Sequence, residues 1–371
     1  MTDALTKIPA GLRYHFGRAA QLRRELAGAF LNTCAGWSYE EITSPTLDYY
    51  ALFERGLGRA TAHHAFRWSD VDGRLLALRP EVTSPLARAA ATLLANRPRP
   101  LRLCYAAQVF QRQPRSHAEW RREATQLGLE LIGAAGLTAD AEILLIAVEL
   151  LETLGLRATS RISLNHAEIF HCLAEQSALT PAACAEIRTL VVNRAVPELR
   201  EFLAANDLTD TLRDAWLWLT QPPDGLAALQ QARAVLTGTR AQKAVAYLSE
   251  LQQTLQTLEI ADLFSFDFGD VPDLDYYTGL VCKIYTAGAG VRVGSGGRYD
   301  GLTAHFGRAE PAVGLVLELD ALTEIWVQRQ DKNGLDGEDA AQGIAVPDSL
   351  EGMRAARTHR ARGTRINLKV T

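Results

Sequence analysis

The stretch LDYYTGLVCKIY (274–285), followed by GAG (288–290) and VRVGSGGRYDGL (291–302), decides the fold. The segments LVCKIY and VRVGSGG have the composition of two strands, and the glycines between them are typical of a hairpin turn. Just ahead, DLFSFDFGD (262–270) alternates strictly through Phe264, Phe266 and Phe268. This part of the chain is therefore predicted to form neighbouring antiparallel strands.

Elements of both kinds are predicted earlier in the chain. Apolar spacing indicates an amphipathic helix from Ala10 to Trp37. A strand then stops at Pro45, another ends at Pro80, and a helix begins at about Ser84. Further predictions are strands in LRLCYAAQVFQRQ (101–113) and EATQLGLELIG (123–133) with a polar hairpin loop between them, a helix over 140–156, a strand in RISLNH (161–166), and a strand in PAVGLVLEL (311–319) that runs into a helix.

The order of these elements predicts an α+β protein with a mostly antiparallel sheet flanked by helices. Helical patterns dominate from about 167 to 260, which indicates a helical insertion within a core of residues 1–330. An acidic linker (331–342) leads to a β-α-β tail (343–371). That tail is too small to bury a core of its own, so we expect it to dock on another surface.

Composition excludes several classes of protein. The 371 residues contain no apolar run long enough to span a membrane and no secretion signal, so a cytoplasmic protein is expected. The five cysteines are scattered and never form a C-x-x-C pair, and the histidines lack metal spacing, so neither a disulfide framework nor a metal site is predicted. A net charge of −4 offers no general attraction to nucleic acid. The arginine-rich segment 353–365 is interpreted as a solvated helix, although it is also the only local basic face.

Two polar pairs are candidates for ligand binding. In LRPEVTS (78–84), Glu81 and Thr83 point the same way if the strand geometry persists, and a carboxylate beside a hydroxyl suits an ammonium group. The segment also fits a helix start, with Thr83 as cap and Glu81 favoured by the helix dipole. In EATQLGLELIG, Gln126, Gly128 and Glu130 share one face of a strand. A polar ligand could lie on this face, with Gly128 leaving room for it, but a solvent-facing strand would have the same pattern.

The hairpin supplies further candidates in Tyr276, Tyr277, Arg298 and Tyr299. Each tyrosine could equally well be a core residue whose hydroxyl group is satisfied. The glycines of VGSGGRYDG (293–301) contain no phosphate-binding motif and are interpreted as sites of backbone crowding or turns.

Taken in order, YEEITSPTLDYYALF (39–53), LRPEVTS, RREATQLGLELIG (121–133), LDYYTG, GSGGRYDGL (294–302) and PAVGLVLEL resemble the catalytic core of histidyl-tRNA synthetases from about Gly11 to Ile325. The resemblance implies a class II aminoacyl-tRNA synthetase-like sheet of about six or seven antiparallel strands, and a homodimer formed through the first helix and strand. It also implies that histidine is held by residues at matching positions, which are Glu81, Thr83, Gln126, Glu130, Tyr277 and Tyr299.

The sequence departs from that family where charge must be stabilised during adenylate formation. The family's arginines on the nucleotide and on the histidine carboxylate are replaced by Gln111, Ala321 and Pro272, and its glutamate in the second motif is replaced by Gln113. Losing one such cation typically costs about 100- to 1000-fold in rate, so amino-acid activation is expected to be lost. No catalytic residue is therefore assigned, and Arg298 or a main-chain amide is the candidate partner of the carboxylate.

This combination is similar to the regulatory subunits of ATP phosphoribosyltransferase, a paralogous family. That resemblance implies a non-catalytic, allosteric subunit of histidine biosynthesis that takes histidine as a feedback signal, partners a short-form catalytic subunit in a hetero-octamer, and needs no cofactor, membrane or tRNA. Two alternatives stay open. One is a functional histidine–tRNA ligase, and the other is a divergent paralogue that acts as a stand-alone amino-acid sensor.

Overall fold

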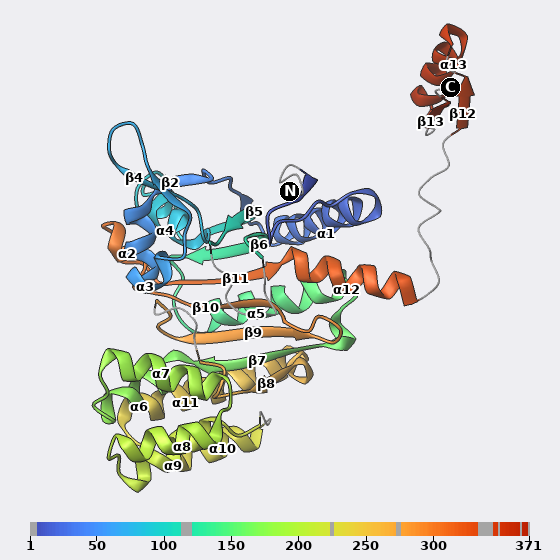
Figure 1. Ribbon diagram of the computed structural model, residues 1–371. Coiled ribbons are helices and arrows are strands. Elements are labelled where there is room, and N and C mark those ends of the chain that lie inside the picture. Colours follow the sequence, from blue (N-terminus) through green and yellow to red (C-terminus); the bar gives the residue numbers. More distant parts are fainter. Residues whose placement is uncertain are drawn as a thin grey trace.

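The computed structural model describes residues 6–112, 121–222, 226–271, 276–332, 344–347, 349–363 and 366–369. Its centre is an eight-stranded sheet in the order β1-β5-β6-β11-β10-β9-β7-β8 (Figure 1). The strands are β1 (Glu40–Glu41), β5 (Leu101–Phe110), β6 (Glu123–Ile132), β7 (Ser160–His166), β8 (Phe264–Phe266), β9 (Leu280–Thr286), β10 (Arg292–Arg298) and β11 (Ala312–Glu318). The expected α+β architecture of a class II synthetase-like core is confirmed.

The sheet is larger and more mixed than the resemblance implied. Five neighbouring pairs are antiparallel, but the short edge strands β1 and β8 pair in parallel with β5 and β7. These two edge strands raise the expected number of six or seven strands to eight. The predicted hairpin of β5 and β6 forms in full register, from Leu101 opposite Ile132 to Phe110 opposite Glu123.

One face of the sheet carries the main core. Leu127, Leu129 and Leu131 of β6 are fully buried there, as their alternation predicts. Three helices belong to this layer, α1 (Gly17–Gly36), α5 (Leu137–Thr153) and α12 (Leu319–Lys332). The first begins later than the predicted start at Ala10. Gly11 and Gly17 have φ angles of +81° and +56°, outside the right-handed helical region, which keeps residues 10–16 out of the helix.

A smaller layer covers the other face of the sheet near β5 and β6. Helix α4 (Thr83–Ala91) packs its apolar side on β5, and Leu86 and Leu103 are both buried there. As predicted, a strand ends just before Pro80 and α4 carries Pro85 in its first turn. Beside α4 lie a three-stranded sheet and two short helices, which are β2 (Leu47–Tyr49), β3 (Arg67–Ser69), β4 (Leu75–Leu78), α2 (Tyr50–Leu57) and α3 (Arg59–Ala62).

Between β7 and β8 the chain leaves the sheet as a helical insertion (Figure 1). Its helices are α6 (Ala167–Gln176), α7 (Pro181–Val192), α8 (Val196–Ala205), α9 (Asp210–Leu219), α10 (Leu226–Val235) and α11 (Thr239–Thr257). Trp216 of α9 is fully buried among them, and its indole Nε1 donates to Ser177 Oγ at 2.9 Å. The insertion therefore has a packed interior that continues into the main core.

The end of the chain forms the predicted β-α-β unit. Strands β12 (Ile344–Pro347) and β13 (Ile366–Lys369) pair in parallel, and α13 (Leu350–Ala361) packs on both. In Figure 1 this unit stands apart from the sheet. Its expected docking surface and the division of the chain into core, linker and tail stay predictions. Across the described part of the chain, every helix is too short or too polar to span a lipid bilayer.

Candidate ligand-binding site

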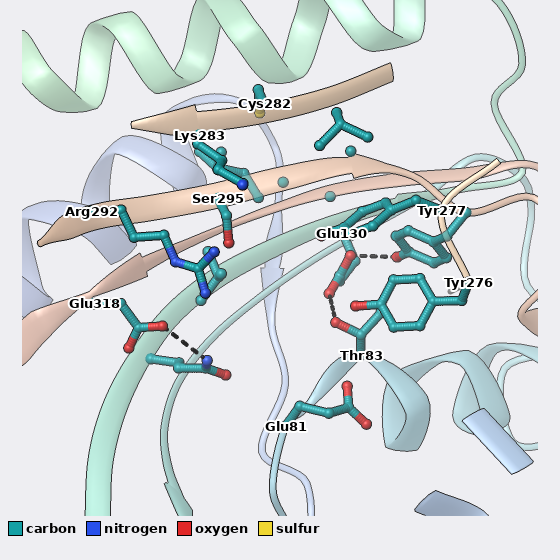
Figure 2. Close-up of a pocket in the computed structure, with 18 of the residues that line it drawn as sticks. Glu81, Thr83, Glu130, Tyr276, Tyr277, Cys282, Lys283, Arg292, Ser295 and Glu318 are labelled. Atoms are coloured by element: carbon teal, nitrogen blue, oxygen red, sulfur yellow. Dashed lines mark hydrogen bonds between the residues drawn. The ribbon is translucent and has the colours of Figure 1, made fainter. Parts of the chain in front are cut away.

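A pocket lies on the face of the central sheet that α4 partly covers (Figure 2). Its floor comes from β6, β9, β10 and β11, and its walls come from the start of α4, from β5 and from the segment 276–277. It holds about 700 Å³ of empty space, counting the part that opens to solvent.

Seven of the eight side chains expected at the site line this pocket. They are Glu81, Thr83, Gln126, Glu130, Tyr276, Tyr277 and Tyr299. They come from four separate parts of the sequence, and the sheet register brings them together. Their role in binding stays a prediction.

Glu130 is the most constrained of these side chains. Thr83 Oγ1 donates to its Oε1 at 2.8 Å, and the Tyr299 hydroxyl donates to its Oε2. The carboxylate fits because β11 carries Gly314 beside it, where a Cβ atom would lie only 1.8 Å from Oε2. Burial raises the pKa of Glu130 to about 7, against the opposing effect of the two hydrogen bonds. This carboxyl therefore titrates near neutral pH.

Glu81 lies both at the start of α4 and in the wall of the pocket. Its carboxylate accepts the backbone N–H of Ser84 at 3.0 Å and so satisfies one donor at the start of α4. It is buried and also lines the pocket. Thr83 does not cap the helix, because its hydroxyl is turned toward Glu130.

Aromatic rings close the pocket around these carboxylates. The rings of Tyr276 and Tyr277 lie 4.9 Å apart, and those of Tyr276 and Tyr299 meet edge to face at 5.7 Å. The room left by Gly128, expected to be open to a ligand, is instead filled by Tyr105. This ring lies opposite Gly128 on β5, and a Cβ atom at Gly128 would come within 2.1 Å of it. A glycine paired with a tyrosine across strands is the signal that sequence reasoning missed.

Two cations in the pocket were also missed. Lys283 of β9 is buried, and its Nζ donates to Asp270 Oδ1 at 3.2 Å and to Val271 O at 3.3 Å. Arg292 of β10 lines the pocket at the end where Glu318 lies (Figure 2). The pocket therefore has Glu81 and Glu130 at one end, and the Arg292 guanidinium beside the Glu318 carboxylate at the other.

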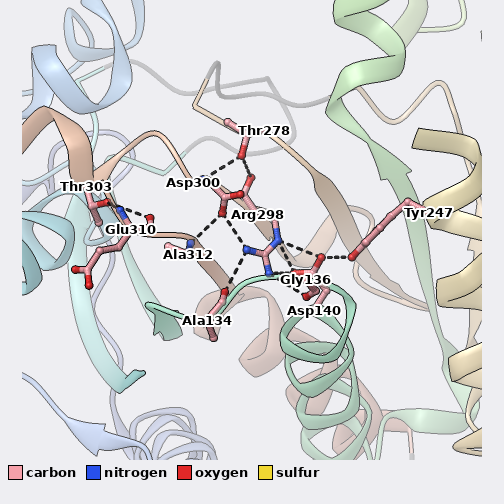
Figure 3. A network of polar contacts seen from close by, with 10 residues as sticks. All are labelled: Ala134, Gly136, Asp140, Tyr247, Thr278, Arg298, Asp300, Thr303, Glu310 and Ala312. Atoms are coloured by element: carbon pink, nitrogen blue, oxygen red, sulfur yellow. Dashed lines mark hydrogen bonds and ion pairs between the residues drawn. The ribbon is translucent and has the colours of Figure 1, made fainter. Parts of the chain in front are cut away.

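Arg298, which was expected in the pocket, points elsewhere. Its guanidinium lies in a buried network (Figure 3), where Nη2 donates to Asp140 Oδ1 at 2.6 Å and Nη1 donates to Asp300 Oδ1 at 2.9 Å. Asp140 also accepts the hydroxyl of Tyr247 from α11 of the insertion. Because Gly297 lines the pocket, alternation along β10 turns the next side chain to the opposite face. Arg298 is a structural residue and does not line the pocket.

A second cavity adjoins the first and shares Gln126, Arg292 and Glu318 with it. It contains Gln111 and Ala321, two of the positions where family arginines are absent, whereas Gln113 and Pro272 lie outside the described residues. Unexpectedly, this cavity also contains Arg121 and Arg122.

Both of these arginines already have partners. Arg121 Nη2 lies 2.6 Å from Glu324 Oε2, and the Arg122 guanidinium stacks 4.7 Å from the centre of the Phe66 ring. Beside them, Asp320 accepts Arg23 Nη1 and the Thr125 backbone N–H, both at 2.8 Å. The positive charges of Arg121 and Arg122 near Gln111 therefore take part in structural contacts. Within the described ranges, no group of three or more His, Cys, Asp or Glu residues is arranged to hold a metal ion.

Comparison with known proteins identifies the structural class to which this fold belongs. The family model described as histidyl-tRNA synthetase matches residues 11–322, so the protein is of the histidyl-tRNA synthetase-like class II type. Two curated relatives, from Moorella thermoacetica and Symbiobacterium thermophilum, are both described as ATP phosphoribosyltransferase regulatory subunits. The first is 34% identical and the match covers 98% of this chain and 92% of the relative; the second is 34% identical with 98% and 90% covered.

A solved structure agrees with both matches. It is described as an ATP phosphoribosyltransferase regulatory subunit/histidyl-tRNA synthetase from Bacillus halodurans, and it superposes with a TM-score of 0.84 at 25% identity over 100% of this chain and 95% of that one. The chain belongs to the family of ATP phosphoribosyltransferase regulatory subunits.

Proposed function

We propose that this protein binds histidine in the pocket and passes that signal to a short-form ATP phosphoribosyltransferase catalytic subunit. The observation that carries the proposal is the buried carboxyl of Glu130, held by Thr83 and Tyr299 at the closed end of a pocket for a small molecule. A carboxyl group so placed can accept an N–H of an imidazole ring. Such a donor favours the ionised carboxylate and would lower the pKa of Glu130 from about 7.

The remaining groups fit the rest of an amino acid. Glu81 offers a second carboxylate for an ammonium group, and Tyr276 and Tyr277 offer aromatic surface to a planar ring. The Arg292 guanidinium lies at the end away from Glu81 and Glu130, beside Glu318, so the pocket offers groups of both signs to a zwitterion. A purely anionic metabolite would bring its negative charge next to these buried carboxylates, which is unfavourable.

Regulation without catalysis is supported by the adjoining cavity. Activation of an amino acid by ATP needs preorganised cations where charge develops on the nucleotide. There the chain carries Gln111 and Ala321, and Arg121 is paired with Glu324. We therefore expect no histidine-dependent exchange of pyrophosphate into ATP. Robust exchange by the purified protein would instead identify a histidine–tRNA ligase.

The regulatory assignment requires a partner and a difference in affinity. Histidine must bind the inhibited assembly more tightly than the active one, by a coupling free energy of about 1–3 kcal/mol. The self-association expected through α1 and β1 would provide two such pockets in each dimer. Co-purification with a short-form catalytic subunit separates this function from that of a stand-alone amino-acid sensor.

The decisive test is histidine inhibition of the reconstituted complex. Glu130→Ala should abolish inhibition while the uninhibited activity of the complex is kept, because the variant lacks the group that meets the ring. Glu123→Ala is the matched control, since it removes a carboxylate from the outer end of the same strand. Unchanged inhibition in the Glu130→Ala complex, with histidine binding intact by calorimetry, would refute the assignment.

A further inference from the structure

We infer that Arg292 holds the carboxylate of the bound amino acid, and that a β-bulge in β10 delivers its side chain into the pocket. The inference rests on the proposed function, since it takes the ligand to be an amino acid. It supplies the cation that the sequence lacks at Pro272, where the related synthetases are expected to carry an arginine.

The register between β9 and β10 shows how Arg292 reaches the pocket. Ser295 lies opposite Lys283 and Gly294 opposite Ile284, but the next partner of Tyr285 is Arg292. One step along β9 therefore corresponds to two steps along β10. The extra residue, Val293, makes this a β-bulge.

The bulge decides which face of the sheet Arg292 occupies. Ser295 and Lys283 both line the pocket, so residues two apart from them share that face. Arg292 is three residues from Ser295, and a regular strand would turn it to the opposite face. The inserted residue restores it to the face of its partner Tyr285, two residues from Lys283, and Arg292 lines the pocket as observed.

Two further cations near the pocket, Lys283 and Arg298, bind protein carboxylates. Lys283 Nζ is bound by Asp270 and by the Val271 carbonyl, and the Arg298 guanidinium is bound by Asp140 on the opposite face. Arg292 is half-buried and lies at the far end of the pocket from Glu130 (Figure 2). A ligand whose ring meets Glu130 would extend its carboxylate toward this guanidinium.

The chemistry of a guanidinium suits this position. Its planar fork binds a carboxylate through two parallel N–H···O bonds, and its five donors allow it to bind more than one partner at once. A lysine at the same place would offer a point charge without the fork. Arg292 therefore selects for ligands that carry a carboxylate.

The test compares two ligands that differ only at that group. Calorimetry measures the binding of L-histidine and of L-histidinol, in which a hydroxymethyl group replaces the carboxylate, to the full-length protein. Arg292→Gln should weaken histidine binding by about 10- to 100-fold and leave histidinol binding within about twofold of wild type. Arg292→Lys should recover part of the histidine affinity. Arg161→Gln is the control for loss of one positive charge from the sheet, since Arg161 is exposed on β7.

The outcomes distinguish failure of the proposed function from failure of the Arg292 assignment. No binding of histidine to the wild-type protein would overturn the proposed function itself. If wild type binds histidine, but Arg292→Gln weakens both ligands equally or neither of them, only the assignment of Arg292 is overturned. A folded Arg292→Lys variant with no more histidine affinity than Arg292→Gln would also contradict a role for the positive charge.

Discussion

Asp140 and Arg298 form a buried ion pair that joins α5 to the end of β10 directly behind the pocket. Asp140 Oδ1 accepts from Nη2 of Arg298 at 2.6 Å and from Nε at 3.0 Å, and both side chains are almost fully buried. The residue after Arg298 is Tyr299, which donates to Glu130. This pair therefore holds one wall of the pocket in place from the opposite face of the sheet.

Removing the charge of Asp140 should be costly. Asp140→Asn leaves a buried guanidinium without its main partner, and we expect the free energy of unfolding to fall by about 3 kcal/mol. Urea unfolding followed by circular dichroism measures the change. Arg240→Gln is the control, because Arg240 pairs with Glu168 and Glu175 on the surface and should cost clearly less stability than the buried pair. Equal losses of stability in the two variants would show that the buried ion pair contributes no more to stability than the surface pair.

Gly314 should tolerate no side chain. A Cβ atom there would lie 1.8 Å from Glu130 Oε2 and 2.8 Å from the Leu129 carbonyl oxygen, so Gly314→Ala must displace the carboxyl group or the strand. We expect a loss of about 1–3 kcal/mol in stability, together with loss of histidine binding if the proposed function holds. Gly301→Ala is the control, since nothing lies within 4 Å of a Cβ at that position. Thermal unfolding measures the change in stability, and calorimetry measures histidine binding. A Gly314→Ala variant with the stability and histidine affinity of wild type would contradict this geometry.

Local patterns predicted most of the fold. Alternation gave the buried leucine face of β6, and the prolines and glycines gave the ends of β4 and the hairpin of β9 and β10. The errors arose where one residue changes the geometry. Gly17 delays the start of α1. The strands predicted before Pro45 and in DLFSFDFGD do form, as β1 and β8, but they are only two and three residues long and pair in parallel with their neighbours.

Errors in predicting the pocket residues have the same origin, because single residues in the strands change which face a side chain occupies. Arg298 was placed there because it adjoins Tyr299, but strand alternation points it to the opposite face. Arg292 was overlooked because its position matters only through the bulge at Val293, and glycines in a strand indicate a bulge without fixing which residue is inserted. Lys283 could have been found, since a lysine inside an apolar strand such as LVCKIY needs a buried partner.

The pH dependence of stability offers a test of the Glu130 environment. Burial raises the pKa of this carboxyl from 4.5 to about 7, and the nearby Glu81 charge acts in the same direction. The folded protein therefore binds the proton more tightly than the unfolded chain does. The contribution of Glu130 to stability is fully present below pH 4.5 and is lost as the pH rises to about 7. The whole change corresponds to about 3 kcal/mol.

Glu130→Gln isolates this contribution, because the amide keeps the shape of the side chain and cannot ionise. Other groups titrate over the same range, so the informative quantity is the difference in unfolding free energy between wild type and variant, measured by urea unfolding from pH 4.5 to pH 8. Wild type should lose stability relative to the variant as the pH rises to about 7, and the difference should then level off. A difference that does not change with pH would mean that the carboxyl has an ordinary pKa, and that water reaches the closed end of the pocket.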